Sequence, residues 1–533
     1  MGFQIFLRNS GFQALMHQKS GRYCGLDDGD LLRRMTGLQS SAGAVVATAS
    51  RAALFVDSRY SLAARQTVAC GKFEILNLKR EEITEWMEGN TSPGGGIAYD
   101  PEFYTHEEME FLQTRLKNRN FVPVCLKQIF GIWRVKRRLE VHRLPGGTSD
   151  KKISFVLEAI HKNRLEAYLI CDPCTVSWLL DIRDFDRKYI PAVAGRLLVR
   201  KNGESTLYLD EDYLFDYQSN YKSAKFLQAD LNTLENLGVD KFETPFHLKH
   251  GNLVHLRNPC LLAKAMKNTS EINDIRRVVL EDSAAMVDFL RWFHCNSGKI
   301  SELEAVGKLR YFRELRKDFV GESFETIAAA DDHAAVVHYI PNEKSNRIVE
   351  NILLFDSGGQ YRYGTTDVTR TVALLEPTEE QKLFYTLVLK GHIALAMAKF
   401  PVGTTGAQLD PLARQFLWKY SSDYGHSTGH GVGYALDVHE GPCAIAKNSG
   451  VPLEIGMILS DEPGYYRENE FGIRLENMML VRRESEGFLS FEILSLAPFD
   501  EKFIDEKLLT DDEITWLRDY HEKVESSLGT TKA

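Results

Sequence analysis

Carboxylate and histidine side chains are concentrated in the second half of this chain. Two aspartates bracket the segment FDSGGQYRYGTTDVTRT, three histidines fall in HSTGHGVGYALDVHEGP, and two glutamates follow in LSDEPGYY and FGIRLENMMLV. Carboxylates with one or two imidazoles form a ligand set that divalent Mn, Co and Zn accept, and an excess of carboxylates suits two adjacent cations. This pattern predicts a hydrolytic metal centre. Its candidate residues are Asp356, Asp367, His426, His430, His439, Glu462 and Glu476.

The spacing of the two aspartates suggests how their side chains could meet. Asp356 and Asp367 flank a turn that contains Gly358, Gly359 and Gly364. If the two flanks pair as neighbouring strands, both carboxylates can reach one point on the sheet. Side chains alternate along a strand, so Asp367 would share a face with Thr369. We therefore expect a hairpin-like arrangement that presents both carboxylates on one concave face.

The glutamates lie where short strands are expected to end. Glu462 precedes Pro463, which ends its strand at the site. Arg474 precedes Glu476 by two residues, which puts a guanidinium on the same strand face as the carboxylate. A ligating carboxylate usually has a hydrogen-bonding partner of its own, and we expect Arg474 to be that partner.

Each of these motifs is weak when taken alone. An aspartate in a glycine-rich turn usually forms the turn, a single histidine is usually a hydrogen-bonded core residue, and a DEPG segment is usually a loop. The chain contains D-x10-D, then H-x3-H-x8-HEGP, then DEPG, then R-x-E. Chance assembly of all four motifs in this order is improbable, so their joint occurrence favours the metal centre.

The first half of the chain alternates strand-like and helical patterns. GAVVATASRAALFVDSRY predicts two strands around a polar turn, at 44–47 and 53–56. A linker is expected over 142–152, where Pro, Gly, Ser and charged residues concentrate. ISFVLEAIHKNRLEAYLICD then predicts a helix followed by a buried strand, so an α/β pattern restarts. The two N-terminal regions are therefore expected to be structural relatives.

The second half predicts helices packed on a curved antiparallel sheet. Apolar residues between 271 and 296 recur in steps of three, four and seven, as on one face of a long helix. Thr378 and Gln381 form a capping box that opens another helix. The segments that hold the acidic candidates are short, β-rich and bounded by Gly or Pro. We therefore expect the acidic residues on the sheet.

Composition narrows the class of protein. The 533 residues carry a formal charge of −9 with 44% hydrophobic and 26% charged residues, as in ordinary globular proteins of several domains. No dense basic run argues for nucleic acid, and no stretch of 18 apolar residues predicts a membrane span. Polar residues near the N-terminus interrupt any secretory signal, so a cytoplasmic protein is expected. The single CxxC, Cys171 and Cys174, favours a structural role over a redox role.

These motifs resemble those of the Xaa-Pro aminopeptidases (aminopeptidase P), in the larger cytosolic type with three domains. The resemblance runs from about Leu31 to the C-terminus and is carried most specifically by DFVGESFETIA, DSGGQYRYGTTDVTRT, HSTGHGVGYALDVHEGP, ILSDEPGYY and GIRLEN. It implies an α/β protein with two N-terminal creatinase-like domains and an α+β catalytic domain of the pita-bread fold. The corresponding boundaries are 1–146, 147–264 and 265–533. The chain departs from the family pattern at Ser40 and Ser41, and at 331–333 near the expected mouth of the pocket.

The resemblance also assigns roles residue by residue. It implies two divalent cations, most often Mn²⁺, with Asp367 and Glu476 touching both. The implied substrate-side histidines are His338, His426 and His439. The implied metal ligands are Asp356, Asp367, His430, Glu462 and Glu476.

The expected reaction releases the N-terminal residue from peptides that have proline at the second position. A hydroxide that bridges the two metals would attack the carbonyl before proline. Glu462 would be the general base and pass a proton to the proline nitrogen. His439 would hydrogen-bond the developing oxyanion, and His426 and His338 would line the proline pocket and assist proton movement or positioning. Arg474 would orient a bridging carboxylate.

Three alternatives share parts of this pattern. A prolidase specific for dipeptides would use the same metal site, but the HEGP motif and the length of the chain favour the aminopeptidase. An inactive relative that binds peptides or proteins is expected to lack ligands, as is a metal-free creatinase-like hydrolase, whereas all five ligands are present here.

The family implies a homodimer, in which Arg59 is a candidate contact near the partner's pocket.

Overall fold

The chain folds into two compact units. The computed structural model describes residues 2–19, 31–68, 72–129, 137–138, 142–144, 149–209, 213–214, 221–223, 227–246, 248, 250–296 and 300–529. The first unit comprises Met1–Asp186 and Ala192–Cys260, and the second comprises Arg187–Pro191 and Leu261–Ala533. The predicted boundary after residue 146 lies outside the described residues. The division before Leu261 falls a few residues ahead of the predicted start of the third domain, and the three domain boundaries remain predictions.

The first unit contains a 6-stranded sheet with the order β4-β3-β2-β1-β5-β6. The predicted pair of strands is confirmed as β2 and β3, which pair antiparallel. Helices of this region are α1 Gly2–Ser10, α2 Leu31–Thr36, α3 Ser61–Thr67, α4 Arg80–Asn90, α5 His106–Arg115 and α6 Leu126–Ile129. Its strands are β1 Ala14–Lys19, β2 Gly43–Thr48, β3 Ala52–Val56, β4 Glu74–Asn77, β5 Gly96–Tyr99 and β6 Asn120–Pro123.

A second 6-stranded sheet in the same unit has the order β14-β12-β11-β9-β15-β16. In both sheets the third strand of the order, β2 or β11, pairs antiparallel with both of its neighbours, and the other three pairings are parallel. The two regions are therefore structural relatives, as the restarted α/β pattern predicted. The helices here are α7 Ser149–Lys162, α8 Pro173–Leu180 and α9 Leu227–Leu231. The strands of this region are β7 Arg137–Arg138, β8 His142–Arg143, β9 Ala167–Ile170, β10 Ile182–Arg183, β11 Gly195–Arg200, β12 Ser205–Leu209, β13 Tyr213–Leu214, β14 Tyr221–Ser223, β15 Leu237–Val239 and β16 Leu253–His255.

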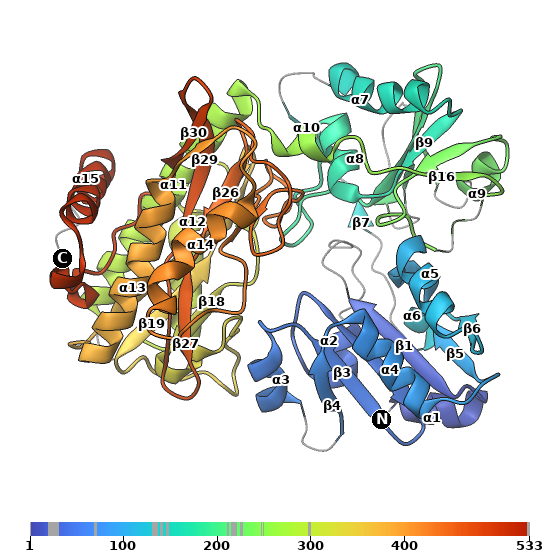
Figure 1. Ribbon diagram of the computed structural model, residues 1–533, viewed down its shortest axis with the longest axis horizontal. Coiled ribbons are helices and arrows are strands. Elements are labelled where there is room, and N and C mark those ends of the chain that lie inside the picture. The colour runs from blue at the N-terminus through green and yellow to red at the C-terminus, as the bar shows by residue number, and fades with distance from the viewer. Residues whose placement is uncertain are drawn as a thin grey trace. The chain divides into compact units, whose positions relative to one another are not determined.

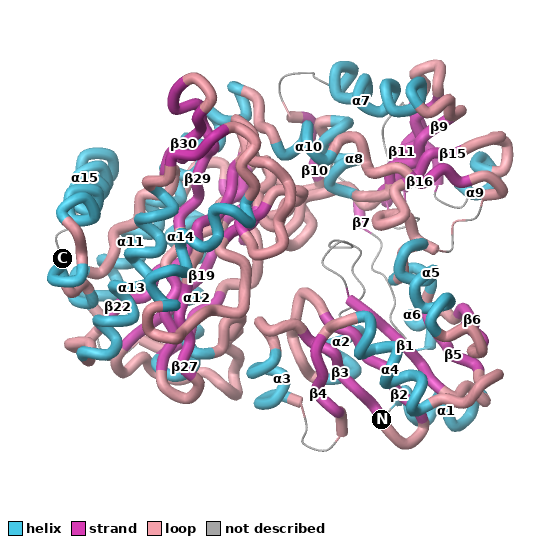
Figure 2. The backbone as a smooth tube through the Cα atoms, viewed as in Figure 1, coloured by secondary structure: helices cyan, strands magenta, loops and turns pink. Residues whose placement is uncertain are grey.

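The second unit packs helices against short antiparallel sheets, and Figure 2 shows its magenta strands running beside cyan helices. The helices are α10 Leu261–Ala265, α11 Thr269–Cys295, α12 Glu302–Glu314, α13 Glu379–Ala396, α14 Gly406–Trp418 and α15 Asp511–Leu528. The strands are β17 Phe319–Glu322, β18 Ile327–Ala330, β19 Ile352–Ser357, β20 Gly359–Tyr361, β21 Gly364–Thr365, β22 Val368–Ala373, β23 Lys399–Pro401, β24 Gly429–His430, β25 Ala444–Ile445, β26 Ile458–Asp461, β27 Gly464–Arg467, β28 Phe471–Arg474, β29 Asn477–Ser485 and β30 Phe488–Ile493.

This unit is built from two halves, each a helix pair on a sheet (Figure 1). In the first half, α11 and α12 cover β18-β19-β22, and Phe289 of α11 packs edge-on against Phe355 of β19 with ring centroids 4.9 Å apart. In the second half, α13 and α14 cover strands that include β23-β30-β29-β26. The predicted long helix is confirmed as α11. The predicted capping box is confirmed at Thr378, which caps α13.

Two other predictions concern the whole chain. Among the helices that the structure describes, none combines the length and apolar character needed to cross a membrane. Cys171 and Cys174 are buried at the start of α8 and form no disulfide, and burial raises the pKa of Cys171 to about 12. A thiol that resists ionisation is a poor redox nucleophile, which agrees with the structural role favoured for this motif.

Candidate metal centre

The two aspartates meet because their strands pair. β19 runs antiparallel to β22, with Asp356 directly opposite Thr369. Asp367 immediately precedes β22, so the turn between the strands returns it to the level of Asp356. Both side chains are buried, at 8% and 4% exposure. The hairpin-like arrangement expected from their spacing is therefore present, with Asp367 just outside the strand.

Glu476 lies between β28 and β29, outside the hydrogen-bond ladders of both strands. Its backbone N–H donates to the carbonyl of Thr369 over 3.1 Å, and its Oε2 accepts from Thr369 Oγ1 over 2.7 Å. Thr369 therefore orients the Glu476 carboxylate from the strand that follows Asp367.

His430 and Glu462 approach from the second half of the unit. His430 ends β24, and Glu462 follows β26, which ends before Pro463 as expected. The Nε2 atom of His430 lies 3.4 Å from Asp367 Oδ2 and 3.5 Å from Glu462 Oε1. Its Nδ1 atom lies 3.0 Å from the carbonyl oxygen of Gly431, to which an Nδ1–H donates. That bond leaves the Nε2 lone pair free for a cation, the usual arrangement of a histidine ligand.

Glycines allow these segments to approach so closely. A Cβ atom at Gly429 would lie 1.9 Å from the carbonyl oxygen of Ser460, and one at Gly431 would lie 2.1 Å from that of Glu440. A larger residue at either position would push β24 away from its neighbours. The glycines beside His430 therefore allow its backbone to pack closely against the backbone of Ser460 and Glu440.

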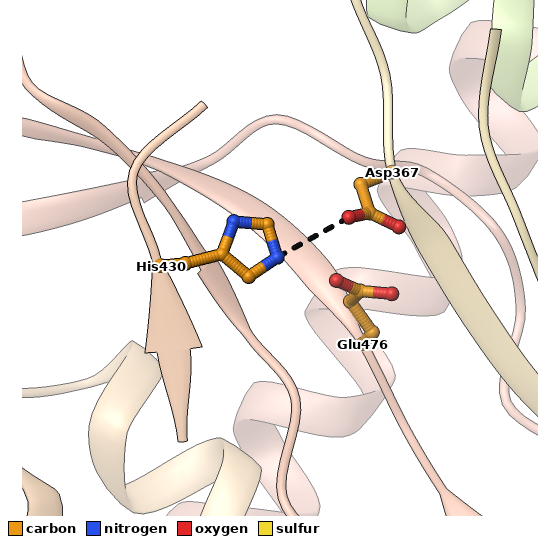
Figure 3. Close-up of side chains that lie close together, drawn as sticks. All are labelled: Asp367, His430 and Glu476. Atoms are coloured by element: carbon orange, nitrogen blue, oxygen red, sulfur yellow. Dashed lines mark ion pairs between the residues drawn. The ribbon is translucent and has the colours of Figure 1, made fainter. Parts of the chain in front are cut away.

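Three of the candidate ligands form one compact cluster. Ligand atoms of Asp367, His430 and Glu476 all lie within 4.8 Å of one another. Figure 3 shows the imidazole and the two carboxylates pointing toward one common position, with the His430–Asp367 ion pair dashed. Glu462 Oε1 lies 3.5 Å from His430 Nε2, and the charges of Asp356 and Glu462 both raise the pKa of Asp367.

The electrostatics of the cluster suit a cation. Burial, followed by repulsion from neighbouring carboxylates, holds the pKa values of Asp367 and Glu476 well above the usual range. Burial also raises the pKa of Glu462. Asp356 Oδ1, Asp367 Oδ1 and Glu476 Oε1 are buried and have no hydrogen-bond partner among the described residues. Oxygens left in this way fit coordination by divalent cations, which would also remove the repulsion.

Arg474 has a different partner from the one expected. Its Nη2 donates to Asp356 Oδ2 over 2.7 Å, and both side chains are buried. Its link to Glu476 is indirect, through Nε at 3.4 Å from Thr369 Oγ1. The expectation that Arg474 directly orients a bridging carboxylate is therefore corrected. The long side chain spans from β28 to β19, and the two-residue spacing along its own strand does not determine which carboxylate it reaches.

Tyr466 connects Arg474 to His426, a role that the sequence did not reveal. The Nη1 atom of Arg474 donates to Tyr466 Oη over 2.8 Å, and that hydroxyl lies 2.9 Å from His426 Nε2. Because a guanidinium can only donate, Tyr466 is free to donate its own proton to Nε2. His426 Nδ1 then donates to the carbonyl of Ser427 over 2.8 Å. Burial raises the pKa of Tyr466 to about 12, so it remains a donor at neutral pH.

The two other histidines border the cluster at different depths. His439 is exposed, and its ring centroid lies 4.3 Å from that of His430. His338 is half-buried and follows Val337, whose carbonyl accepts from Arg474 Nη1 over 3.2 Å. The segment of His338 therefore lies beside the guanidinium.

A buried charge cluster supports the loop of His439. Glu440 accepts from Lys264 Nζ over 2.8 Å and from Lys267 Nζ over 2.6 Å, and all three side chains are at most 5% exposed. The two ammonium groups hold the pKa of Glu440 below its usual range against the effect of burial. The sequence analysis did not identify this cluster, because Lys264 ends up beside Glu440 from α10 and Lys267 from the segment that follows that helix.

Comparison with protein families gives four matches along the chain. Residues 273–483 match the metallopeptidase family M24, and residues 487–531 match the C-terminal region of that peptidase family. Residues 8–126 and 137–271 match creatinase/prolidase N-terminal domains.

Curated relatives extend the match over almost the whole chain. A protein of Pyricularia oryzae named "Probable Xaa-Pro aminopeptidase P" is 33% identical, with 92% of this chain and 88% of the relative covered. One of the same name from Neurospora crassa is 34% identical, with 93% and 80% covered. The chain belongs to the Xaa-Pro aminopeptidase P family.

Solved structures agree with membership of the Xaa-Pro aminopeptidase P family. The X-prolyl aminopeptidase of Caenorhabditis elegans, described as a cytosolic enzyme with a di-nuclear active site, is 32% identical with a TM-score of 0.90, covering 98% of this chain and 93% of that one. The prolidase of Pyrococcus horikoshii shares the fold, with 23% identity, a TM-score of 0.53, and 66% and 99% covered. The predicted family and the predicted fold class, two creatinase-like domains before a pita-bread catalytic domain, are confirmed.

Proposed function

We propose that this protein is a metal-dependent aminopeptidase that releases the first residue from peptides with proline at the second position. The observation that carries the proposal is the convergence of Asp367, His430 and Glu476 on one position, with buried carboxylate oxygens that lack partners among the described residues. The names of its relatives support the substrate class.

The residues that would hold two divalent cations, which we propose to be Mn²⁺, are Asp356, Asp367, His430, Glu462 and Glu476. Their oxygen and nitrogen donors suit Mn²⁺, and the surplus of carboxylates suits a pair of cations. When bound, such cations polarise the substrate carbonyl and lower the pKa of a bound water. Arg474 would keep Asp356 in position, because its guanidinium pairs with that carboxylate inside the protein.

Glu462 is our candidate for moving a proton. Its Oε1 lies 3.5 Å from His430 Nε2, and a carboxylate at this place could accept a proton and later release it to the leaving proline nitrogen. Ser460 Oγ donates to Glu462 Oε1 over 3.3 Å and holds this oxygen in place.

The histidines would bind the peptide around the reacting carbonyl. His439 is exposed beside His430, where a ring N–H can donate to the oxygen that becomes negative. His426 keeps both ring nitrogens in hydrogen bonds to Ser427 and Tyr466, so we assign it to positioning and to the wall of the proline pocket. His338 would complete that wall.

A requirement for proline follows from the chemistry of the bond. The proline nitrogen carries no N–H and its ring restricts the preceding residue, so a protease that binds extended strands recognises this bond poorly. A pocket that fits the proline ring would select peptides with proline at the second position.

The decisive experiment compares three peptides on one preparation: Xaa-Pro-Yaa-Yaa, Xaa-Ala-Yaa-Yaa and the dipeptide Xaa-Pro. We expect release of Xaa from the first alone, loss of this activity after chelation, and its return with Mn²⁺. Cleavage of the dipeptide alone would make the protein a prolidase. Full activity of metal-free protein, or none in any metal, would overturn the proposal.

We further propose a cytoplasmic homodimer. The Caenorhabditis elegans relative is described as cytosolic, which supports the compartment. Arg59 forms an ion pair with Asp57 over 2.7 Å within its own domain, so this guanidinium is held in place for a contact with a second copy. Sedimentation of the full-length chain would test the dimer, and a monomer at micromolar concentration would contradict it.

A further inference from the structure

Arg370 lies on β22, whose Thr369 is hydrogen-bonded to Glu476, and its guanidinium is completely buried. It follows Thr369, whose hydroxyl orients the Glu476 carboxylate, and alternation along β22 sends the two side chains to opposite faces. All three guanidinium nitrogens of Arg370 donate hydrogen bonds. The acceptors are the carbonyls of Thr369, Glu476, Ala497 and Pro498, Asn477 Oδ1 and Tyr520 Oη.

One of these contacts fixes the backbone of a candidate ligand. The Nη1 atom donates to the carbonyl of Glu476 over 2.6 Å and to that of Thr369 over 2.8 Å. Glu476 lies between two strands, so these bonds and those from Thr369 replace the support that a strand ladder would give. The guanidinium therefore joins Glu476 to the strand that carries its other contacts.

Residues of the C-terminal segment contact the guanidinium of Arg370. Tyr520 of α15 accepts from Arg370 Nη2 over 3.0 Å and donates to the carbonyl of Ala497 over 2.8 Å. Phe499 lies against the guanidinium, with 4.3 Å from Cζ to the ring centroid. Trp516 stacks on Tyr520 with a centroid distance of 5.3 Å. The helix α15 thus reaches Glu476 through a single intervening side chain.

Arg370 differs from the other buried arginines of this unit in the kind of group that accepts its hydrogen bonds. Arg313, Arg414 and Arg474 each pair with an aspartate, at 2.8, 2.7 and 2.7 Å. The acceptors of Arg370 are neutral, and no carboxylate of the described chain forms an ion pair with it. A buried cation of this kind is stabilised by negative charge beyond its contact shell, and the carboxylate cluster lies directly across the strand.

We propose that Arg370 and Tyr520 are positioning residues for Glu476, and that the C-terminal helix α15 thereby forms part of the metal centre. Arg370 sets the backbone of Glu476, and Tyr520 sets Arg370. This inference rests on the proposed function, because Glu476 must be a metal ligand for its position to matter.

The test uses Tyr520→Phe in the full-length chain, with Tyr385→Phe as the matched control. Tyr385 is also a fully buried tyrosine against the C-terminal segment, but its hydroxyl accepts from the Asp500 N–H and makes no hydrogen bond to Arg370. Each protein is stripped of metal and titrated with MnCl₂ alone by calorimetry, and its thermal unfolding is recorded with and without Mn²⁺. Partners that orient metal ligands typically contribute 10–100-fold in affinity, so we expect about tenfold weaker Mn²⁺ binding in Tyr520→Phe. Tyr385→Phe should bind as the wild type does.

Arg370→Lys provides a second, independent variant. It keeps the positive charge but has a single nitrogen, which cannot replace the bonds that three guanidinium nitrogens divide between the Glu476 carbonyl, Tyr520 and the carbonyls of the C-terminal segment. We expect weaker Mn²⁺ binding than in Tyr520→Phe. Wild-type affinity in both Tyr520→Phe and Arg370→Lys, or an equal loss in Tyr385→Phe, would overturn the inference and leave these residues as ordinary core contacts. Failure of the wild type itself to bind Mn²⁺ would instead refute the proposed function.

Discussion

The Nη2 atom of Arg474 lies 2.7 Å from Asp356 Oδ2, and the pair is almost completely removed from water. Charged partners buried together depend on each other, because removal of one leaves an uncompensated charge in a medium of low polarity. The same guanidinium donates to Tyr466, so one side chain connects a candidate metal ligand with Tyr466 and, through it, with His426.

Replacement of Arg474 by methionine should therefore weaken metal binding. The buried Asp356 carboxylate would lose its counter-charge and its fixed position, and we expect about 10–100-fold lower Mn²⁺ affinity. Calorimetric titration of the apoprotein measures this directly. Arg474→Lys serves as the control that retains the charge, and equal affinity in all three proteins would exclude a role for the ion pair.

Glu462→Gln should abolish most turnover while the fold remains intact. An amide cannot accept the proton that general base catalysis requires, which typically costs about 10²–10⁴-fold. The measurement is kcat with an Xaa-Pro-Yaa-Yaa peptide, accompanied by Mn²⁺ stoichiometry to separate lost chemistry from lost metal. Near wild-type turnover would remove Glu462 from the proposed role.

His439→Ala should lower kcat more than it raises KM. A donor to a developing oxyanion contributes mainly in the transition state, where removal of one such donor typically costs about 10²–10³-fold. Steady-state kinetics over a range of peptide concentrations distinguishes the two parameters. If only KM changes, His439 contributes to substrate binding alone.

Stability of the metal-free protein should fall as the pH rises. The pKa values of Asp367 and Glu476 are raised in the folded state, so the folded protein binds more protons than the unfolded one above the ordinary carboxyl pKa of about 4. The free energy of unfolding therefore decreases as the pH rises toward the raised pKa values. Thermal unfolding between about pH 5 and about pH 8 should show this decline in apoprotein and a smaller one with Mn²⁺. A flat profile without metal would contradict the raised values.

Glu440→Gln should destabilise the protein more than Lys264→Met. The first change leaves two buried ammonium groups without a carboxylate, a situation that typically costs about 3–5 kcal/mol. The second leaves Glu440 paired with Lys267. Chemical denaturation of the two variants gives the comparison, and the reverse order would show that the lysines do not depend on Glu440.

Local sequence patterns predicted several of the elements. The capping box at Thr378 and the apolar face of α11 are encoded within a few residues. Three of the five proposed ligands, Asp367, His430 and Glu476, lie together in one cluster, and the assignment of the full set stays a prediction. The partner of Arg474 and the link through Tyr466 were not predictable in this way. Both contacts depend on the distance between β28 and β19 and on which long side chain fills the space between them. The spacing of residues along the chain gives no information on either.

The proposed ligands are divided between the two halves of the second unit. Asp356 and Asp367 come from the half covered by α11 and α12, whereas His430, Glu462 and Glu476 come from the later half. A chain still emerging from the ribosome therefore holds an incomplete site until its last ligand has been translated. If the proposed ligands hold the cations, a chain that stops before Glu476 would lack part of the site and would not hydrolyse peptides.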